Sequence, residues 1–170
     1  SSIQALLVKH LKKDLAHIPI AAYYGCLLTR PPRITDLESN PEQPQLMEQI
    51  LSAIGAKPLA WTHKNECCGA SLAIPQPHLV EDLVGKIIAA ARYAGAAAIV
   101  TACPLCQTNL DGRQQGGERS LPVLYITEMV GLALGLNVNP WFKKHLVDPW
   151  PVLQLQNLQE APREKGCEMP

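Results

Sequence analysis

The 170-residue sequence lacks a long uninterrupted apolar run, and it lacks an excess of charge of either sign. Without a run of about 18 apolar residues, we expect none of its segments to span a membrane. The 15 basic and 15 acidic residues give a formal net charge of zero, and they form no basic stripe. We therefore expect no nucleic-acid partner, because nucleic-acid-binding domains carry clustered Lys and Arg.

The sequence also lacks an initiator methionine, an export signal and any internal repeat. Residues 1–19 mix lysines into an apolar stripe, which predicts an amphipathic helix and not a signal peptide. We therefore expect either a processed chain or a piece of a longer protein.

Cysteine is the residue type that stands out among those present. Six cysteines in a secreted protein would indicate three disulfides. However, a chain of this length with 47% hydrophobic residues can bury a sizeable core and does not need such cross-links. We therefore favour a reducing setting, with a metal or redox role for the thiols.

The apolar pattern predicts an α/β fold. Four short runs are expected to be strands buried on both faces, because none of them alternates polar and apolar residues. These runs cover 20–24, 57–61, 97–102 and 122–126. Helical spacing between them predicts helices over 42–54 and 78–94 and a third helix capped by Thr127. The alternation indicates a small parallel sheet of about four strands with helices on both faces.

We expect one domain over residues 1–150 and an extended tail over residues 151–170. The tail carries repeated prolines, which are incompatible with regular structure. It also carries Cys167, which we expect to be a free, exposed thiol unrelated to the others.

The remaining cysteines follow three predicted strands. Cys26 comes after the first strand, Cys67 and Cys68 after the second, and Cys103 and Cys106 after the third. The carboxyl ends of parallel strands meet at one edge, which is where open α/β sheets bind ligands. The sequence therefore predicts a metal site built from three loops at the carboxyl ends of the strands.

The identity of the metal is left open by the residues alone. Soft thiolates in this number select zinc, copper(I) or iron–sulfur. Zinc takes four ligands, whereas an iron–sulfur cluster can use additional thiolates, which favours iron–sulfur. Zinc is the alternative, and a dithiol redox pair or an inert core is the remaining possibility.

Several neighbours of the cysteines are candidates for supporting roles. Gly25 and Gly69 would let the backbone approach a cluster closely, and a helix starting near residue 105 would direct its amides at the sulfurs. Three polar residues after the last cysteine either hydrogen-bond the sulfurs or only cap and solvate the helix; they are Gln107, Asn109 and Asp111. His63, Arg30 and Arg33 are either site residues or ordinary loop residues.

The segments around these cysteines resemble those of a known family. The cysteine pattern and its flanks resemble the cysteine-rich CCG domain in the carboxy-terminal half of the B subunit of heterodisulfide reductase. The similar segments cover nearly all of residues 1–150; they are "YYGCLLTRPP", "ECCGASLA", "ACPLCQTNLD", "LPVLYITEMVGLALGL" and "HLVDP".

The resemblance implies a cofactor and partners. In that family five cysteines hold a non-cubane [4Fe-4S] cluster, and the chemistry with a disulfide or thiol substrate takes place at the cluster. The matching ligands here would be Cys26, Cys67, Cys68, Cys103 and Cys106. Implied partners are flavin-containing and ferredoxin-like iron–sulfur subunits and a second CCG domain in cis or trans. The implied location is the cytoplasm, with any membrane association through partners.

Other functions remain open beside this one. The same domain occurs in iron–sulfur subunits of enzymes that oxidise glycolate, lactate or succinate, and in sulfur-oxidising complexes. The chain could then be an electron-transfer subunit without disulfide chemistry, or a zinc-binding structural module for assembly. The segment "YYGCLLTRPP" favours the heterodisulfide reductase branch.

Overall fold

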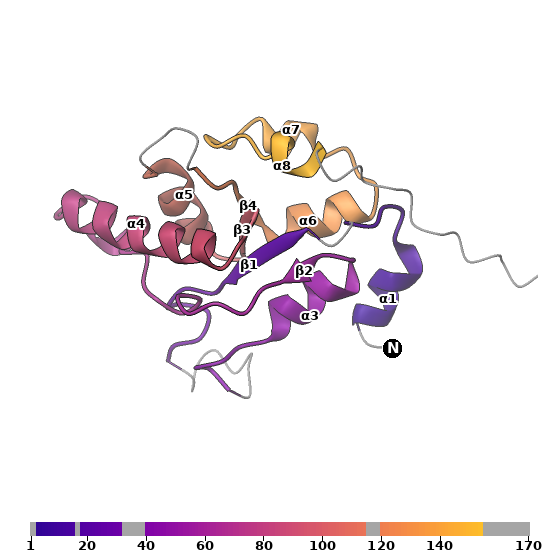
Figure 1. Cartoon of the computed structure of the whole chain (residues 1–170), viewed down its shortest axis with the longest axis horizontal. Coiled ribbons are helices and arrows are strands. Elements are labelled where there is room, and N and C mark those ends of the chain that lie inside the picture. Colours follow the sequence, from indigo (N-terminus) through magenta and orange to yellow (C-terminus); the bar gives the residue numbers. More distant parts are fainter. Residues whose placement is uncertain (1–2, 16–17, 32–39, 115–119, 155–170) are drawn as a thin grey trace, which may run out of the picture.

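A parallel sheet forms the centre of the computed structural model, which describes residues 3–15, 18–31, 40–114 and 120–154 (Figure 1). The sheet has four strands in the order β2-β1-β3-β4, and every neighbouring pair is parallel. The strands are β1 (Pro19–Tyr23), β2 (Lys57–Pro58), β3 (Ala98–Thr101) and β4 (Val123–Tyr125). The predicted fold class and the four-stranded parallel sheet are confirmed.

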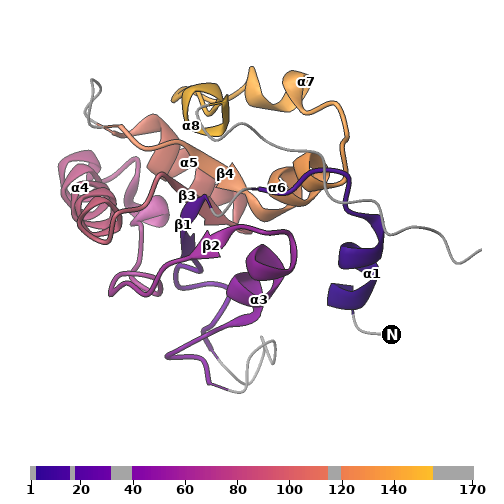
Figure 2. The ribbon, with the colours of Figure 1, turned by 45° about the vertical axis from the view of Figure 1, so that its right-hand side comes forward.

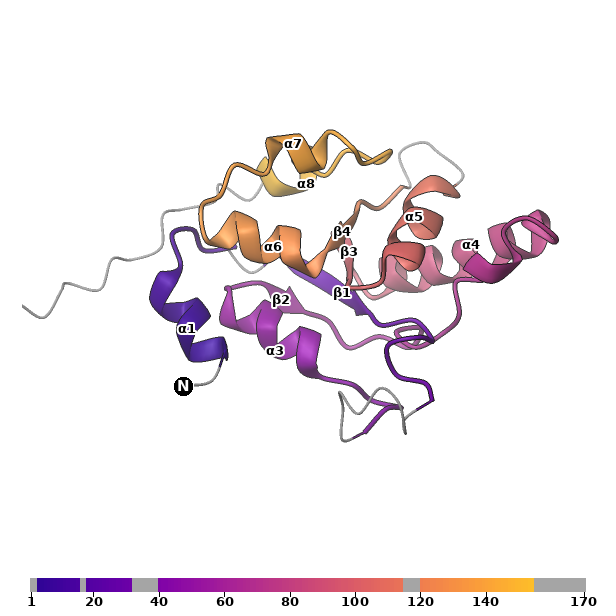
Figure 3. The ribbon, with the colours of Figure 1, turned by 180° about the vertical axis from the view of Figure 1, so that it is seen from behind.

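Helices cover both faces of this sheet (Figures 2 and 3). One face packs against α1 (Ile3–His10), α3 (Leu46–Ala53), α6 (Ile126–Ala133), α7 (Asn139–Phe142) and α8 (Trp150–Gln154). The other face packs against α4 (Pro77–Tyr93) and α5 (Pro104–Gly112). A short 3₁₀ helix, η1 (Ala70–Leu72), follows the Cys-Cys pair.

The strand β1 shows why its sequence does not alternate. Ile20 and Ala22 belong to the apolar core on one face, and Ala21 and Tyr23 belong to the core on the other. All four are fully buried. A strand between two helical layers therefore needs apolar residues at every position.

The edge strand β2 is shorter than the predicted 57–61. Pro58 has no backbone N–H, so it cannot extend the hydrogen-bond ladder on the open side. Beyond it, the Leu59 N–H still donates to the Ile20 carbonyl at 2.8 Å, and the Trp61 indole N–H donates to the Ala22 carbonyl at 2.9 Å. The segment stays beside β1, although it leaves regular strand geometry.

The predicted cap of α6 is wrong. Tyr125 and not Thr127 is the N-cap residue, and Thr127 lies exposed within the first turn. The carboxylate of Glu128 accepts the Tyr125 N–H at 2.8 Å. The chain passes from β4 into α6 without a loop residue, so the last strand residue occupies the capping position.

The C-terminal segment folds back over α6 and α5. The rings of Phe142 in α7 and Trp150 in α8 lie 5.2 Å apart, and Leu153 is fully buried. Residues 151–154 are therefore helical, whereas an extended tail was predicted from residue 151. Residues 155–170, with Cys167, lie outside the described residues, and the domain boundary at residue 150 stays a prediction. Among the described helices, none has the length and apolarity needed to cross a membrane.

Candidate metal centre

The five predicted ligand cysteines come from three segments at the carboxyl ends of the strands. Cys26 follows β1, Cys67 and Cys68 lie in the connection after β2, and Cys103 is the N-cap residue of α5 after β3. Cys106 lies in the first turn of that helix. Cys67 is exposed and Cys26 half-buried, while the other three thiols are buried. The centre therefore runs from the core of the domain to its surface.

The structure brings thiols from different segments into contact. The Cys26 and Cys67 sulfurs lie 3.7 Å apart, and the Cys68 and Cys106 sulfurs lie 3.7 Å apart. A further contact joins Cys106 to Cys103. All five thiols are unbridged.

Tyr23, the last residue of β1, lies beneath this group. Burial raises the pKa of its phenol, and the charges of Cys106, Cys68, Cys67 and Cys26 raise the pKa further when these thiols ionise. The phenol therefore stays protonated, and its O–H donates to the Glu66 carbonyl at 2.6 Å. This bond ties the residue just before the Cys-Cys pair to the strand that precedes Cys26.

Gly25 and Gly69 each require glycine, but for different structural reasons. Gly25 has a φ of +63°, and a Cβ there would lie 2.9 Å from the Cys106 sulfur, so glycine lets the backbone approach this thiol. Gly69 has a φ of +74°, but its Cβ would meet Leu83 of α4 at 2.9 Å and not a sulfur. Its N–H donates to the Cys67 sulfur at 3.3 Å. Close approach to the sulfurs thus explains Gly25, while Gly69 supports the turn and helix packing.

Hydrogen bonds favour a thiolate at Cys68. They lower the pKa of this thiol to about 6, mainly because the Cys106 thiol donates to it. The Ala70 N–H and the Asn109 amide lower the pKa further, whereas partial burial raises it. The pKa of the Cys106 thiol is raised, because this thiol keeps the proton shared with Cys68. Burial and the negative charge of Cys68 raise it further. Burial, followed by the contact with Cys67, raises the pKa of Cys26. The hydrogen bonds therefore favour the thiolate at Cys68, which is the form that binds soft metals.

The three polar residues after Cys106 have different partners. Asn109 is buried and donates to the Cys68 carbonyl at 2.6 Å, so it is the one of the three that contacts the centre. Asp111 instead accepts the backbone N–H groups of Leu146 and Val147, at 2.8 and 3.2 Å. Gln107 contacts the Val123 carbonyl and His145. Asp111 and Gln107 therefore anchor neighbouring segments.

The loop residues considered as site residues have local partners. His63 contacts the Thr62 hydroxyl at 2.8 Å, and Arg30 forms an exposed ion pair with Glu42 at 2.7 Å. Arg33 lies outside the described residues. These contacts match the interpretation of His63 and Arg30 as ordinary loop residues.

A buried polar network, which sequence reasoning missed, joins the Cys26 and Cys67 loops. The Lys64 amine donates to Glu48 at 2.5 Å and to the Pro44 carbonyl at 2.6 Å, and the Tyr24 hydroxyl donates to Glu48 at 2.6 Å. The Lys64 carbonyl accepts the N–H groups of Tyr24 and Gly25, at 2.8 and 3.1 Å. Only the position of Lys64 close before the Cys-Cys pair could have signalled this role.

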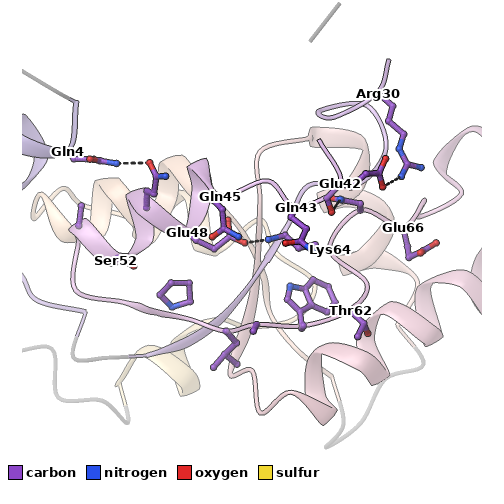
Figure 4. A pocket seen from close by; sticks show the side chains of 17 residues that line it. Gln4, Arg30, Glu42, Gln43, Gln45, Glu48, Ser52, Thr62, Lys64 and Glu66 are labelled. Carbon is purple, nitrogen blue, oxygen red and sulfur yellow. Dashed lines mark hydrogen bonds and ion pairs between the residues drawn. The ribbon is translucent and has the colours of Figure 1, made fainter. Parts of the chain in front are cut away.

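This network forms one wall of a groove of about 1100 Å³ between α3 and the segment after β2 (Figure 4). Figure 4 shows Lys64 reaching toward Glu48, and the Arg30–Glu42 pair farther along. The lining is mostly polar and ends at Glu66, directly before Cys67. The groove therefore adjoins the exposed side of the cysteine group.

Within the described ranges, no three His, Cys, Asp or Glu side chains are arranged as ligands of a single metal ion. The sulfurs instead form the two 3.7 Å pairs, with Cys103 beside one of them. The donor set is soft, partly buried and supplied with N–H donors from Gly69, Ala70 and Asn109. This set fits a sulfur-bound group that contains more than one metal atom.

Comparison with known proteins identifies the family. The CCG cysteine-rich domain family matches residues 20–111, which include the five predicted ligand cysteines and more than half of the chain. The chain belongs to the CCG cysteine-rich domain family. The resemblance seen in the sequence is thereby confirmed.

Three relatives illustrate which curated proteins the chain is similar to. The 8-methylmenaquinol:fumarate reductase membrane anchor subunit of Wolinella succinogenes is 33% identical over 76% of this chain and 48% of its own. The B subunit of the Ferredoxin/F(420)H(2)-dependent CoB-CoM heterodisulfide reductase of Methanosarcina acetivorans is 34% identical over 71% and 42%. A protein of Archaeoglobus profundus that is named as similar to the heterodisulfide reductase B subunit is 29% identical over 77% and 47%.

The chain spans about half the length of these relatives, between 42% and 48%. Identity to the fumarate reductase subunit and to the heterodisulfide reductase B subunit is nearly equal, at 33% and 34%. The preference for the heterodisulfide reductase branch therefore stays a prediction.

Proposed function

We propose that the chain is an iron–sulfur redox subunit, or a domain of one, in a heterodisulfide-reductase-like complex. Cys26, Cys67, Cys68, Cys103 and Cys106 would hold a non-cubane [4Fe-4S] cluster, and the substrate would be a disulfide or its thiols. The observation that carries the proposal is the gathering of five thiols from three segments at one sheet edge.

The spacing of the sulfurs supports a cluster over a single zinc ion. Two sulfurs bound to one tetrahedral metal at about 2.3 Å lie about 3.8 Å apart. The Cys26–Cys67 and Cys68–Cys106 pairs, each at 3.7 Å, have this spacing separately. Two pairs, each suited to one metal atom, favour a group with several metal atoms.

The residues around the sulfurs are suited to a redox centre. When bound, a cluster of this kind supplies electrons to, or accepts them from, the sulfurs of a substrate. The chain's own part is to hold negative charge: the Gly69 N–H donates to the Cys67 sulfur, and the Ala70 N–H and the Asn109 amide favour the thiolate form of Cys68. The exposed thiol of Cys67 marks the side from which a substrate or partner would reach the centre.

Exposed apolar residues support a second CCG domain, in cis or in trans, at this edge. Leu27 directly follows Cys26, Leu105 lies between Cys103 and Cys106, and Ile74 comes after the Cys67-Cys68 pair. Their exposed fractions are 60%, 57% and 93%, respectively. Large exposed apolar side chains in the cysteine-bearing segments are candidates for an interaction surface. The half of the relatives' length that this chain does not match is a natural source for the domain that covers it.

A second candidate is an electron-transfer subunit without disulfide chemistry, which the fumarate reductase relative favours. An anaerobically reconstituted chain, reduced by one electron, would separate the two functions. If the cluster acts on sulfur, we expect adding a small thiol or disulfide to change its paramagnetic signal. An unchanged signal would favour simple electron transfer.

Substitution of one cysteine tests the ligand set. We expect Cys67→Ser to lose iron or to change the visible and paramagnetic spectra, because this exposed thiol forms one of the two sulfur pairs. Cys167→Ser, the same change at the cysteine outside the set, should leave iron content and spectra unchanged. Wild-type iron content and spectra in Cys67→Ser would show that the ligand assignment is wrong.

A further inference from the structure

A second cavity, of about 450 Å³, lies beside α5, where Gln107 lines it. It is bounded by the end of β4, the first turn of α6 and the segment after α7. Thr127 and Lys144 are exposed at its rim, so water can enter. His145 and Glu128 line its interior.

These two residues form a buried ionisable pair. The Nε2 atom of His145 lies 3.0 and 3.2 Å from the two carboxylate oxygens of Glu128. Their side chains are only 3% and 10% exposed. Glu128 also accepts the Tyr125 N–H at 2.8 Å, so its position is fixed by the start of α6. Burial on this scale, with both carboxylate oxygens engaged, indicates a built arrangement.

The pair reaches toward the cysteine centre along two routes. Gln107, the residue directly after Cys106, contacts the Nδ1 atom of His145 at 3.4 Å. On the other route, Tyr125 lines the same cavity as the pair, and burial, followed by the charges of Glu128 and Cys103, raises the pKa of its phenol. His145 itself contacts neither thiol in the described interactions; Gln107, next to Cys106 in α5, is the residue that joins it to the cysteine-bearing segment.

The surrounding charges favour a proton on His145. Burial alone would lower the pKa of this imidazole, but the hydrogen bond and charge of Glu128 raise it above its ordinary value, with help from the Asp111 charge and the Val123 carbonyl. Lys144 at the rim is the remaining charged group of the cavity lining. Any further negative charge nearby would therefore favour the protonated form of His145.

We propose that the His145–Glu128 pair is the proton-binding site coupled to the cysteine centre and takes up a proton from the cavity when the centre is reduced. The proposal rests on the proposed function, because it requires a redox group on the cysteines.

The step balances in charge and atoms. One electron, from an iron–sulfur or flavin donor, enters the centre and adds one negative charge there. One proton, taken from water in the cavity, binds Nδ1 of the His145 ring, the nitrogen that Glu128 does not occupy and that the Gln107 side chain contacts at 3.4 Å. Glu128 keeps its hydrogen bond at Nε2 throughout, so its role is to orient the ring and stabilise the imidazolium. On oxidation the proton returns to the cavity or passes on toward a nascent thiolate.

The test is the pH dependence of the reduction potential in the reconstituted chain. We expect the potential of the wild type to fall with rising pH, approaching about 59 mV per pH unit where one proton accompanies one electron. In His145→Gln the potential should be independent of pH over that range. His78→Gln, the same change at an exposed histidine at the start of α4, should keep the wild-type slope.

A second measurement does not need the cluster. In the metal-free chain with reduced thiols, NMR titration should show a pKa for His145 above the ordinary histidine value, and Glu128→Gln should lower it. Unchanged folding of the variants is checked by circular dichroism. If the pair were only a latch for the C-terminal segment, His145→Gln would lower the melting temperature and leave the slope of the potential intact.

The outcomes separate this inference from the proposed function. A chain that binds no iron and no sulfide overturns the proposed function. A chain that binds both, but whose wild-type potential does not change with pH, overturns the proton site alone. The wild-type measurements decide even if His145→Gln fails to fold.

Discussion

At the scale of single residues, the centre is defined by which thiols touch. The sulfur pairs Cys26–Cys67 and Cys68–Cys106 each join two different segments, and Cys68 has a pKa of about 6. A thiolate beside a neutral thiol is the arrangement from which a disulfide forms when an oxidant is present. Such oxidation competes with metal binding for the same sulfurs.

We therefore predict a specific disulfide pattern in the metal-free chain. Glutathione disulfide, which is reduced to two glutathione molecules for each bridge formed, should produce Cys26–Cys67 and Cys68–Cys106 bridges and leave Cys103 unbridged. The bridges are expected because their sulfurs already lie 3.7 Å apart. Peptide mapping by mass spectrometry identifies them. A dominant Cys67–Cys68 or Cys103–Cys106 bridge would contradict the described arrangement, and prior loading with metal should prevent all bridges.

At the scale of elements, two buried polar contacts hold the segments around the centre. The Tyr24–Glu48–Lys64 network joins the end of β1, α3 and the connection to Cys67. His145 and Asp111 hold the C-terminal segment against α6 and α5. Both contacts link residues far apart in the sequence, so their loss should loosen whole segments.

Tyr24→Phe tests the first contact. The change leaves the Met47 N–H and one Glu48 oxygen without the hydroxyl that they now bond, at 2.8 and 2.6 Å. We expect the free energy of unfolding in urea to fall by about 1–3 kcal/mol, the usual cost of an unsatisfied buried polar group. Tyr93→Phe removes a hydroxyl from a nearly fully exposed ring and should leave stability unchanged. Equal stability of the two variants would mean that the network contributes nothing measurable.

The second contact predicts a pH dependence of stability. Because Glu128 and Asp111 raise the pKa of His145 in the folded chain, protonation favours folding. Its contribution is fully present below the ordinary histidine value of about 6.5 and is lost as the pH rises through the raised pKa. Urea unfolding of the metal-free, reduced chain between about pH 6 and 8 should show the wild type losing stability relative to His145→Gln as the pH rises, while the lowered pKa of Cys68 acts equally on both. Parallel curves for the two proteins would contradict this account.

At the scale of the whole molecule, the sequence predicts the fold class and the cysteine-bearing edge, because both depend on repeated patterns. Apolar runs without alternation indicate the parallel sheet, and cysteines after three successive runs indicate a shared site. The early end of β2 and the capping of α6 by Tyr125 depend on local backbone geometry, which the apolar pattern does not specify. Lys64 and His145 could not be predicted, since a lone charged residue shows nothing of partners that are distant in the chain.

Metal removal should destabilise the whole domain, because three connections of the sheet meet at the thiols. If the metal binds only the folded chain, at about a thousand times its dissociation constant it adds about 4 kcal/mol. Chelation or oxidation should then lower the melting temperature by roughly 10 °C. A variant with all five ligand cysteines replaced by serine should not respond to chelation. An unaltered melting temperature in the wild type would place the cysteine centre outside the stabilising core.

The most direct test of the central claim is the metal and sulfide content of protein prepared and kept without oxygen. Five thiols that hold one [4Fe-4S] cluster predict about four iron atoms and four acid-labile sulfides per chain, with little zinc. One zinc ion per chain without sulfide would contradict the claim. The α/β fold would then stand, and the cysteine edge would be a structural zinc site.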